Sequence, residues 1–269
     1  MWRQEIISLI KTSRAAALTR KTSRFPCMHH AFMPPDGASA DSFGPDARSP
    51  ADARSLGGWV ARVLSHTVNP LVLPPLLLGL VLAHLGAPLS EIGWAVSVGV
   101  AFCALLPLAY VARLLRARRV RSLEIPERAR RRGPLLVSVV AYLGALAVLW
   151  TTAETAAALL AILAGLHAGN TALILVVTLR WKISIHTAAL GSFISMLMFV
   201  AQTPWPERVL EATLLSPGAV SGLLLVLGAL MWARVRLGAH TPAQAAGGAL
   251  FGLVLPYAEL SMLAVGRFV

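Results

Sequence analysis

Two histidines and several basic residues stand out in this sequence as groups that could bind and react with phosphate. His186 lies in the segment WKISIHT and His240 lies in the segment ARVRLGAHTPAQ. Histidine can act as a nucleophile, an acid or a base near neutral pH, because its unperturbed pKa is about 6.5. Arginine binds phosphate oxygens through a planar fork of donors. Two histidines among such cations suggest phosphoryl transfer through a phosphohistidine.

The segment around His240 has the most specific spacing. Arg234 precedes His240 with five residues between them, and Gln244 follows His240 after three more. Four residues span about one helical turn, so Gln244 can reach His240 if this segment is helical. The small residues that follow are typical of close helix packing; they are Ala245, Ala246, Gly247, Gly248 and Gly252.

Two segments earlier in the chain supply further candidates. From the arginine-rich segment 121–134 (RSLEIPERARRRGP) we expect phosphate contacts by Arg128, Arg131 and Arg132. Taken alone, this segment is also explained as a topology determinant that meets anionic lipid headgroups. In the segment 181–187, Lys182 and Ser184 are candidate phosphate ligands close to His186. Simple interfacial roles are the alternative for Lys182 and His186.

In their order along the chain, these three segments resemble the signatures of the type 2 phosphatidic acid phosphatase and haloperoxidase superfamily. The resemblance covers about residues 110–255. The last signature, Ser-Arg, five residues, His, three residues, Asp, is matched at Arg234 and His240. The second, Pro-Ser-Gly-His, is matched at Ser184 and His186. The first, Lys, six residues, Arg-Pro, is matched loosely by the arginine-rich segment that ends at Pro134.

The resemblance implies a hydrolase acting on a lipid phosphate or on an isoprenyl phosphate or diphosphate. His240 would attack the phosphorus, and His186 would protonate the leaving alkoxide. Arg234 and arginines of the first segment would hold the phosphoryl oxygens and stabilise charge in the transition state. The resemblance implies neither a metal nor another cofactor.

Three positions depart from the family pattern. Ala233 stands in place of the serine, Ile185 in place of the glycine, and Gln244 in place of the aspartate that would stabilise a charged His240. In the serine-protease triad, losing the corresponding charge lowers the rate by about four orders of magnitude. The alternative is therefore a related protein with little or no turnover that binds or transports phospholipid headgroups.

A second alternative, a small transporter of another fold, would depend on polar residues inside apolar segments. His167, Asn170 and Glu259 are such residues, and ionisable or polar groups at membrane depth are candidates for function. An interhelical hydrogen bond explains His167 and Asn170 more simply. No inverted repeat, a common feature of transporters, is visible in the sequence.

The composition predicts that membrane-spanning helices position all these residues. Of the 269 residues, 57% are hydrophobic and 13% are charged, whereas soluble domains average about a quarter charged residues. A span needs about 20 apolar residues, and seven segments qualify: 66–86, 91–112, 134–152, 155–180, 185–203, 217–235 and 243–264. We expect a kink in the first, which contains Pro70, Pro74 and Pro75. Residues 57–269 are predicted to form an all-α, polytopic transmembrane bundle of about six to seven spans.

Basic residues are distributed unevenly between the two sides of these predicted spans. One side holds 22 of the 24 lysines and arginines, including all three candidate segments. The positive-inside rule places that side and the N-terminus in the cytoplasm of a cell inner or plasma membrane. The expected partners are the bilayer and a lipid phosphate. The net charge of +12 is explained by these loops without nucleic acid. The sequence leaves the oligomeric state open.

Residues 1–56 have a different composition, rich in Ser, Ala, Pro, Gly and Asp. They contain no apolar run long enough for a span or a signal-peptide core, so we expect a disordered, basic and polar cytosolic tail. Residues 6–18 could form a basic amphipathic helix on a membrane surface. Cys27 to His30 offer metal ligands, although a tail without a site explains them more simply. Met28 and Met33 are alternative starts.

Overall fold

A computed structural model of the chain describes residues 55–120, 125, 128–204 and 209–265. The predicted N-terminal tail therefore lies almost entirely outside the described residues. Within the described ranges the chain is helical and contains no strand. Six helical segments are long and apolar enough to cross a membrane. The predicted fold class, an all-α polytopic bundle, is confirmed, and the chain is an integral membrane protein.

The first predicted span, 66–86, is observed as a break followed by one short apolar helix, where the sequence predicted a kink. Helix α3 (Leu56–Thr67) ends before Asn69, and helix α4 (Leu73–His84) begins after it. The Asn69 side chain accepts a hydrogen bond of 3.0 Å from the Leu71 N–H, which stabilises the turn. Pro74 lies in the first turn of α4. The backbone N–H groups of a first turn have no partner within the helix, so the N–H that proline lacks removes no helical hydrogen bond. At about 18 Å long, α4 is shorter than a bilayer core of about 30 Å.

The second span is one continuous helical segment of 28 residues with an irregular middle. It consists of α5 (Leu89–Gly99), a π-helical turn η1 (Val100–Leu105) and α6 (Leu106–Arg116). Pro107 lies in the first turn of α6, two residues after the π-helical turn ends, and proline cannot supply the N–H of a regular α-helical bond. A bulge of this kind is frequent near functional sites, and Pro107 lines the cavity described below.

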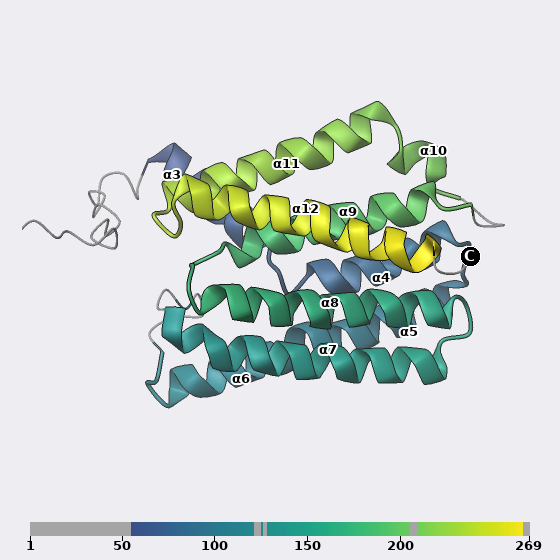
Figure 1. Cartoon of the computed structure of the whole chain (residues 1–269), viewed down its shortest axis with the longest axis horizontal. Coiled ribbons are helices and arrows are strands. Elements are labelled where there is room, and N and C mark those ends of the chain that lie inside the picture. The colour runs from purple at the N-terminus through teal and green to yellow at the C-terminus, as the bar shows by residue number, and fades with distance from the viewer. Residues whose placement is uncertain (1–54, 121–124, 126–127, 205–208, 266–269) are drawn as a thin grey trace, which may run out of the picture. The chain divides into compact units, whose positions relative to one another are not determined.

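The remaining long helices complete the bundle (Figure 1). After the 3₁₀ turn η2 (Arg128–Arg131), α7 (Arg132–Thr152) and α8 (Ala157–Thr178) form an antiparallel pair. The short α10 (Glu211–Leu214) separates α9 (Ile185–Gln202) from α11 (Pro217–Arg236), and α12 (Pro242–Val265) follows. These bounds agree with the predicted spans to within a few residues.

Helices α9 and α12 pack against each other closely, because small residues line their contact. A Cβ atom on Gly252 would lie 2.7 Å from the Ser192 nitrogen, and one on Gly191 would lie 2.9 Å from the Ala249 oxygen. The close approach allows hydrogen bonds between the helices, among them Thr187 Oγ1 to the Ala245 carbonyl at 2.9 Å. The predicted close-packing role of Gly248 is confirmed, because a Cβ atom there would lie 2.5 Å from the Ser184 carbonyl oxygen.

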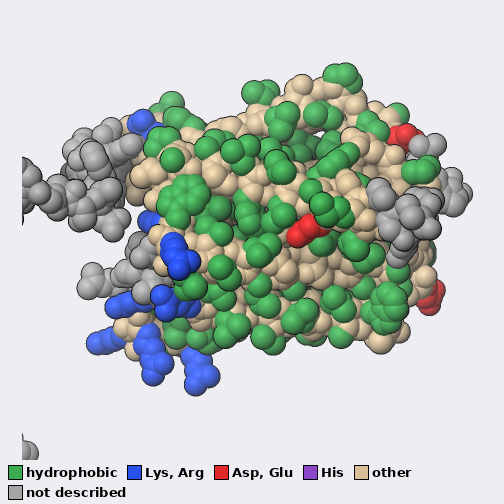
Figure 2. Space-filling view, in the orientation of Figure 1, with side chains coloured by type: hydrophobic (Ala, Val, Ile, Leu, Met, Phe, Trp, Pro, Cys, Tyr) green, Lys and Arg blue, Asp and Glu red, His purple; other side chains and the backbone are tan. Residues whose placement is uncertain are grey.

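The ends of the bundle differ in charge. In Figure 2, lysines and arginines gather at one end of the visible face, and acidic side chains lie towards the middle and the opposite end. The basic end is the one where α6 ends, α7 begins, and the α8–α9 and α11–α12 turns lie (Figure 1). The three candidate segments therefore meet at a single end of the bundle.

Candidate phosphate site

A cavity of about 300 Å³ opens between the helices near the basic end of the bundle. Four of the predicted site residues line it: Arg131, His186, Arg234 and His240. They come from η2, the first turn of α9, the last turn of α11 and the α11–α12 turn. Residues separated by more than 100 positions in the sequence thus line one cavity.

The turn between α11 and α12 fixes the spacing of Arg234 and His240. The Arg234 carbonyl accepts hydrogen bonds from the N–H groups of Ala239, at 3.1 Å, and His240, at 3.3 Å. Gly238 has a φ of 67°, in the left-handed region that glycine tolerates without strain. This helix-ending turn folds the chain back, so that both side chains reach the same cavity.

Gln244 orients the His240 ring through a capping box at the start of α12. The Thr241 hydroxyl accepts from the Gln244 N–H at 3.3 Å, and Gln244 Oε1 accepts from the Thr241 N–H at 3.2 Å. The same Oε1 atom lies 3.2 Å from His240 Nδ1. An amide oxygen can only accept, so Nδ1 carries the proton in this contact. In the neutral ring, Nε2 then keeps its lone pair.

Burial and the surrounding cations keep His240 in the neutral form. His240 is only 6% exposed. Burial, followed by the positive charges of Arg131, Lys182 and Arg234, lowers its pKa from 6.5 to about 3, although the hydrogen bond with Gln244 acts in the opposite direction. At neutral pH the ring is therefore an uncharged base beside three cations.

Arg234 is a buried cation held by a hydroxyl from another helix. Its side chain is 2% exposed, and its Nη1 donates a hydrogen bond of 2.6 Å to Oγ of Ser65 on α3. Burying a charged group is unfavourable in an apolar environment unless it has hydrogen-bonding partners. The contact depends on the packing of α3 against α11.

The other predicted ligands occupy different places. Ser184 is buried outside the cavity lining, and its hydroxyl accepts from the Thr187 N–H at the start of α9. Lys182 is half-buried and does not line the cavity; burial, followed by the positive charges of Arg131 and Arg234, lowers its pKa.

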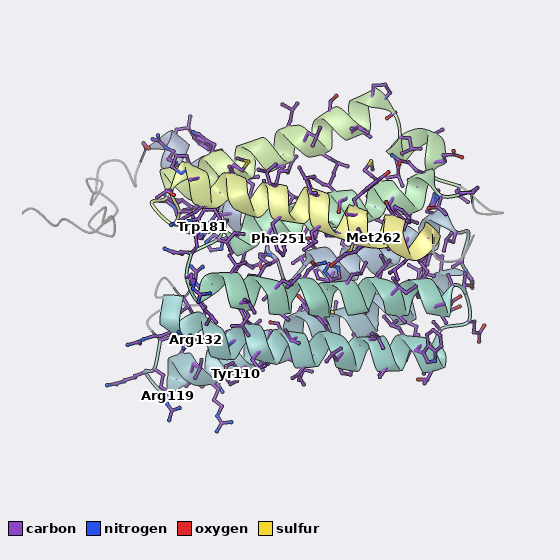
Figure 3. The ribbon with its side chains drawn as sticks, viewed as in Figure 1. Tyr110, Arg119, Arg132, Trp181, Phe251 and Met262 are labelled. Atoms are coloured by element: carbon purple, nitrogen blue, oxygen red, sulfur yellow. The ribbon has the colours of Figure 1, made fainter. Side chains whose placement is uncertain are left out.

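Within its described part, the arginine-rich segment contributes one arginine to the cavity lining, beside Ile125 and Pro134. Arg131 lines the cavity, and its Nε donates a hydrogen bond of 2.7 Å to the Ile125 carbonyl. Arg132 is exposed at the start of α7, near the same end of the bundle as Arg119 (Figure 3). The side chain of Arg128 lies outside the described residues.

Three residues near the site were not singled out from the sequence. His66 and Asn69 line the cavity, and Ser65 holds Arg234. His66 fell inside the first predicted span, and the others lie next to its boundary or within it. The Asn69-Pro70 dipeptide, a turn signal, was the feature that could have identified a break there.

In comparisons of this chain with family models, curated proteins and solved structures, no match is found in any of the three.

Proposed function

We propose that the protein is a membrane-embedded lipid phosphatase that works through a phosphohistidine on His240. The observation that carries this proposal is the arrangement around His240. Its Nδ1 is bound to Gln244, and its neutral ring lies in a cavity lined by Arg131, Arg234 and a second histidine, His186. A neutral imidazole among phosphate-binding cations has the properties required of a nucleophile in phosphoryl transfer.

The proposed reaction has two steps. In the first, Nε2 of His240 forms a bond to phosphorus while the bond to the leaving alkoxide breaks, and a protonated His186 gives its proton to that alkoxide. In the second, water gives a proton to His186 and its oxygen attacks the phosphorus, which breaks the bond to Nε2. Arg131 and Arg234 stabilise the charge on the phosphoryl oxygens in both steps.

The apolar part of the cavity supports a lipid substrate. Apart from its charged and polar residues the lining is mainly hydrophobic, with Leu71, Leu73, Leu108, Val111, Leu135 and Ile174 among the contributing residues. Such a lining accommodates a hydrocarbon chain, while the cations at the mouth bind the phosphate. We place the site at the cytoplasmic interface, on the basis of the excess of basic residues at this end of the bundle.

Phosphoenzyme trapping tests the proposal. Purified protein in detergent is incubated with a radiolabelled lipid phosphate and quenched in alkali, which preserves phosphohistidine. We expect label on the wild-type chain, and neither label nor hydrolysis above background with His240→Ala. Full hydrolysis by His240→Ala would overturn the mechanism. A folded His240→Ala variant is recognised by an unchanged gel-filtration profile.

A second candidate function is phospholipid binding without turnover. It is favoured by the uncharged Gln244 amide beside His240, which orients the ring but cannot stabilise an imidazolium. In that case lipid phosphates bind to the wild-type protein with an affinity that depends on Arg234, but no phosphoenzyme and no hydrolysis are detected.

A further inference from the structure

The cavity extends from the phosphate site into the interior of the bundle, where it meets polar side chains. Its inner lining includes Tyr142 on α7 and His167 and Asn170 on α8. On α8, His167 lies seven residues from Ile174, a lining residue nearer the basic end. At 1.5 Å per residue this separation is about 10 Å, or two helical turns.

Asn170 lines this part of the cavity and has a buried side-chain acceptor without a partner among the described residues. The residue is 4% exposed, and its Nδ2 donates a hydrogen bond of 2.8 Å to Oε2 of Glu259 on α12. This bond fixes the amide plane and its orientation. The other polar atom, Oδ1, is buried and has no hydrogen-bond partner in the part of the chain that the structure describes.

His167 adds a second polar atom on the same face of α8. It lies three residues before Asn170, which places the two side chains on neighbouring turns. Its ring lies 5.7 Å from the ring of Tyr142, centroid to centroid. Its Nε2 is also buried, without a hydrogen-bond partner among the described residues.

The interhelical bond explains only part of this arrangement. It accounts for Nδ2 of Asn170, but leaves Oδ1 and the histidine nitrogen unexplained. A buried polar atom without a hydrogen-bond partner destabilises the folded state. A plain hydrocarbon chain in the cavity would leave both atoms unsatisfied, whereas a ligand with a hydrogen-bond donor at this depth would satisfy Oδ1.

We propose that Asn170 and His167 form a second polar subsite, which binds a hydroxyl or an amide N–H on the lipid tail. The preferred substrate is then a lipid phosphate that carries a hydrogen-bond donor on its tail, at the chain position that reaches Asn170 when the phosphate lies beside His240. Unsubstituted isoprenyl and alkyl phosphates lack such a donor. This inference rests on the proposed phosphate site for the position of the headgroup.

Binding of non-hydrolysable phosphonates tests the subsite independently of turnover. The probes are straight-chain alkyl phosphonates in which one hydroxyl is moved along the chain, with the unsubstituted phosphonate as the reference. Affinities for the purified full-length protein in detergent are measured by calorimetry. We expect one hydroxyl position to bind the wild-type protein about five- to tenfold more tightly than the reference, as one added hydrogen bond allows.

Two variants separate the subsite from general folding effects. Asn170→Leu removes the acceptor, and His167→Phe removes the ring nitrogens while keeping an aromatic ring beside Tyr142. We expect Asn170→Leu to abolish the preference and His167→Phe to reduce it, with binding of the unsubstituted phosphonate retained as evidence of an intact fold. The matched control is Ser192→Ala, which alters a cavity residue on α9 and should leave the preference unchanged.

The outcomes distinguish this inference from the proposed function. Binding of every phosphonate with equal affinity overturns the subsite while leaving the phosphate site in place, and so does a preference that survives in Asn170→Leu. A clear preference without hydrolysis of the matching phosphates supports the subsite and overturns the catalytic proposal. If no phosphonate binds, both are wrong.

Discussion

Gln244 Oε1 lies 3.2 Å from Nδ1 of His240 and at the same distance from the Thr241 nitrogen, whose N–H it accepts. One amide oxygen therefore caps the N-terminus of helix α12 and also sets the tautomer of His240, which lines the cavity. A carboxylate in this place would do both and would also stabilise a positive charge on the ring. The uncharged amide provides the orientation alone.

Gln244→Glu is expected to increase hydrolysis. Glutamate has the length of glutamine and keeps the capping box, so it adds charge without moving the ring. In the serine-protease triad, replacing the carboxylate by an amide lowers kcat by about 10⁴-fold, and that replacement also changes the histidine tautomer. Because Gln244 already sets the tautomer here, we expect a smaller gain of about tenfold in kcat. The measurement is steady-state hydrolysis of a lipid phosphate.

Gln244→Ala is the matched control for that substitution. It removes the capping box, for which we expect a loss of about 1 kcal/mol in stability, and it lowers kcat because the ring loses its orientation. If Gln244→Glu and the wild-type protein are both inactive while lipid phosphates still bind, the non-catalytic alternative is favoured.

Arg234→Gln is expected to lower kcat/KM by about 10²- to 10³-fold, the effect of removing one donor to a transition-state oxyanion. Arg236→Gln on the same helix is the control. Arg236 lies 5.8 Å from the Trp232 ring and donates to Ser55, outside the cavity lining. We expect this control to retain at least half of the wild-type kcat/KM. Equal losses in both variants would show that Arg234 has no specific role.

The pH profile should reflect the lowered pKa of His240. The reaction needs the neutral ring, so the acid limb of kcat/KM is expected well below pH 6.5, towards the pKa of about 3. Because the folded-state pKa is below the unfolded value of 6.5, the stability contributed by His240 is fully present above pH 6.5. It is lost progressively as the pH falls from 6.5 towards about 3.

Arg131→Gln tests the cause of that shift. Removing this cation should raise the pKa of His240 and move the acid limb to higher pH. Arg132→Gln, a neighbouring but exposed position outside the cavity lining, is expected to leave the limb in place. An acid limb near pH 6.5 in the wild-type protein would contradict the electrostatic explanation.

Gly252→Ala should separate α9 from α12 and weaken the site. The added Cβ would meet the Ala188 carbonyl and lie 2.7 Å from the Ser192 nitrogen, and both are backbone atoms with little freedom to move. We expect a loss of about 1–3 kcal/mol, as for other overpacked contacts, seen as a lower Tm in detergent. The Cβ atom added by Gly228→Ala on α11 would have no neighbouring atom within 4 Å. This substitution should therefore leave Tm unchanged or slightly raised. A Tm drop of equal size in both would disprove the packing explanation.

The sequence by itself determined the spans and the charge asymmetry of this protein. A bilayer requires about 20 apolar residues in a helix that satisfies its own backbone hydrogen bonds. Composition alone therefore predicted 185–203 and 217–235, which are observed as α9 (Ile185–Gln202) and α11 (Pro217–Arg236). The spacing from Arg234 to His240 was also visible, because both residues belong to one local turn.

Only the tertiary structure decided which distant residues complete the site. Ser65 contacts Arg234, 169 positions away in the sequence, because α3 packs against α11. No local sequence pattern predicts such a contact. The prolines after Asn69 were compatible with a kink or a break, and the Asn69 side chain stabilises the turn at the break. Ser184 caps α9 outside the cavity lining, since side-chain direction depends on how helices pack rather than on spacing along the chain.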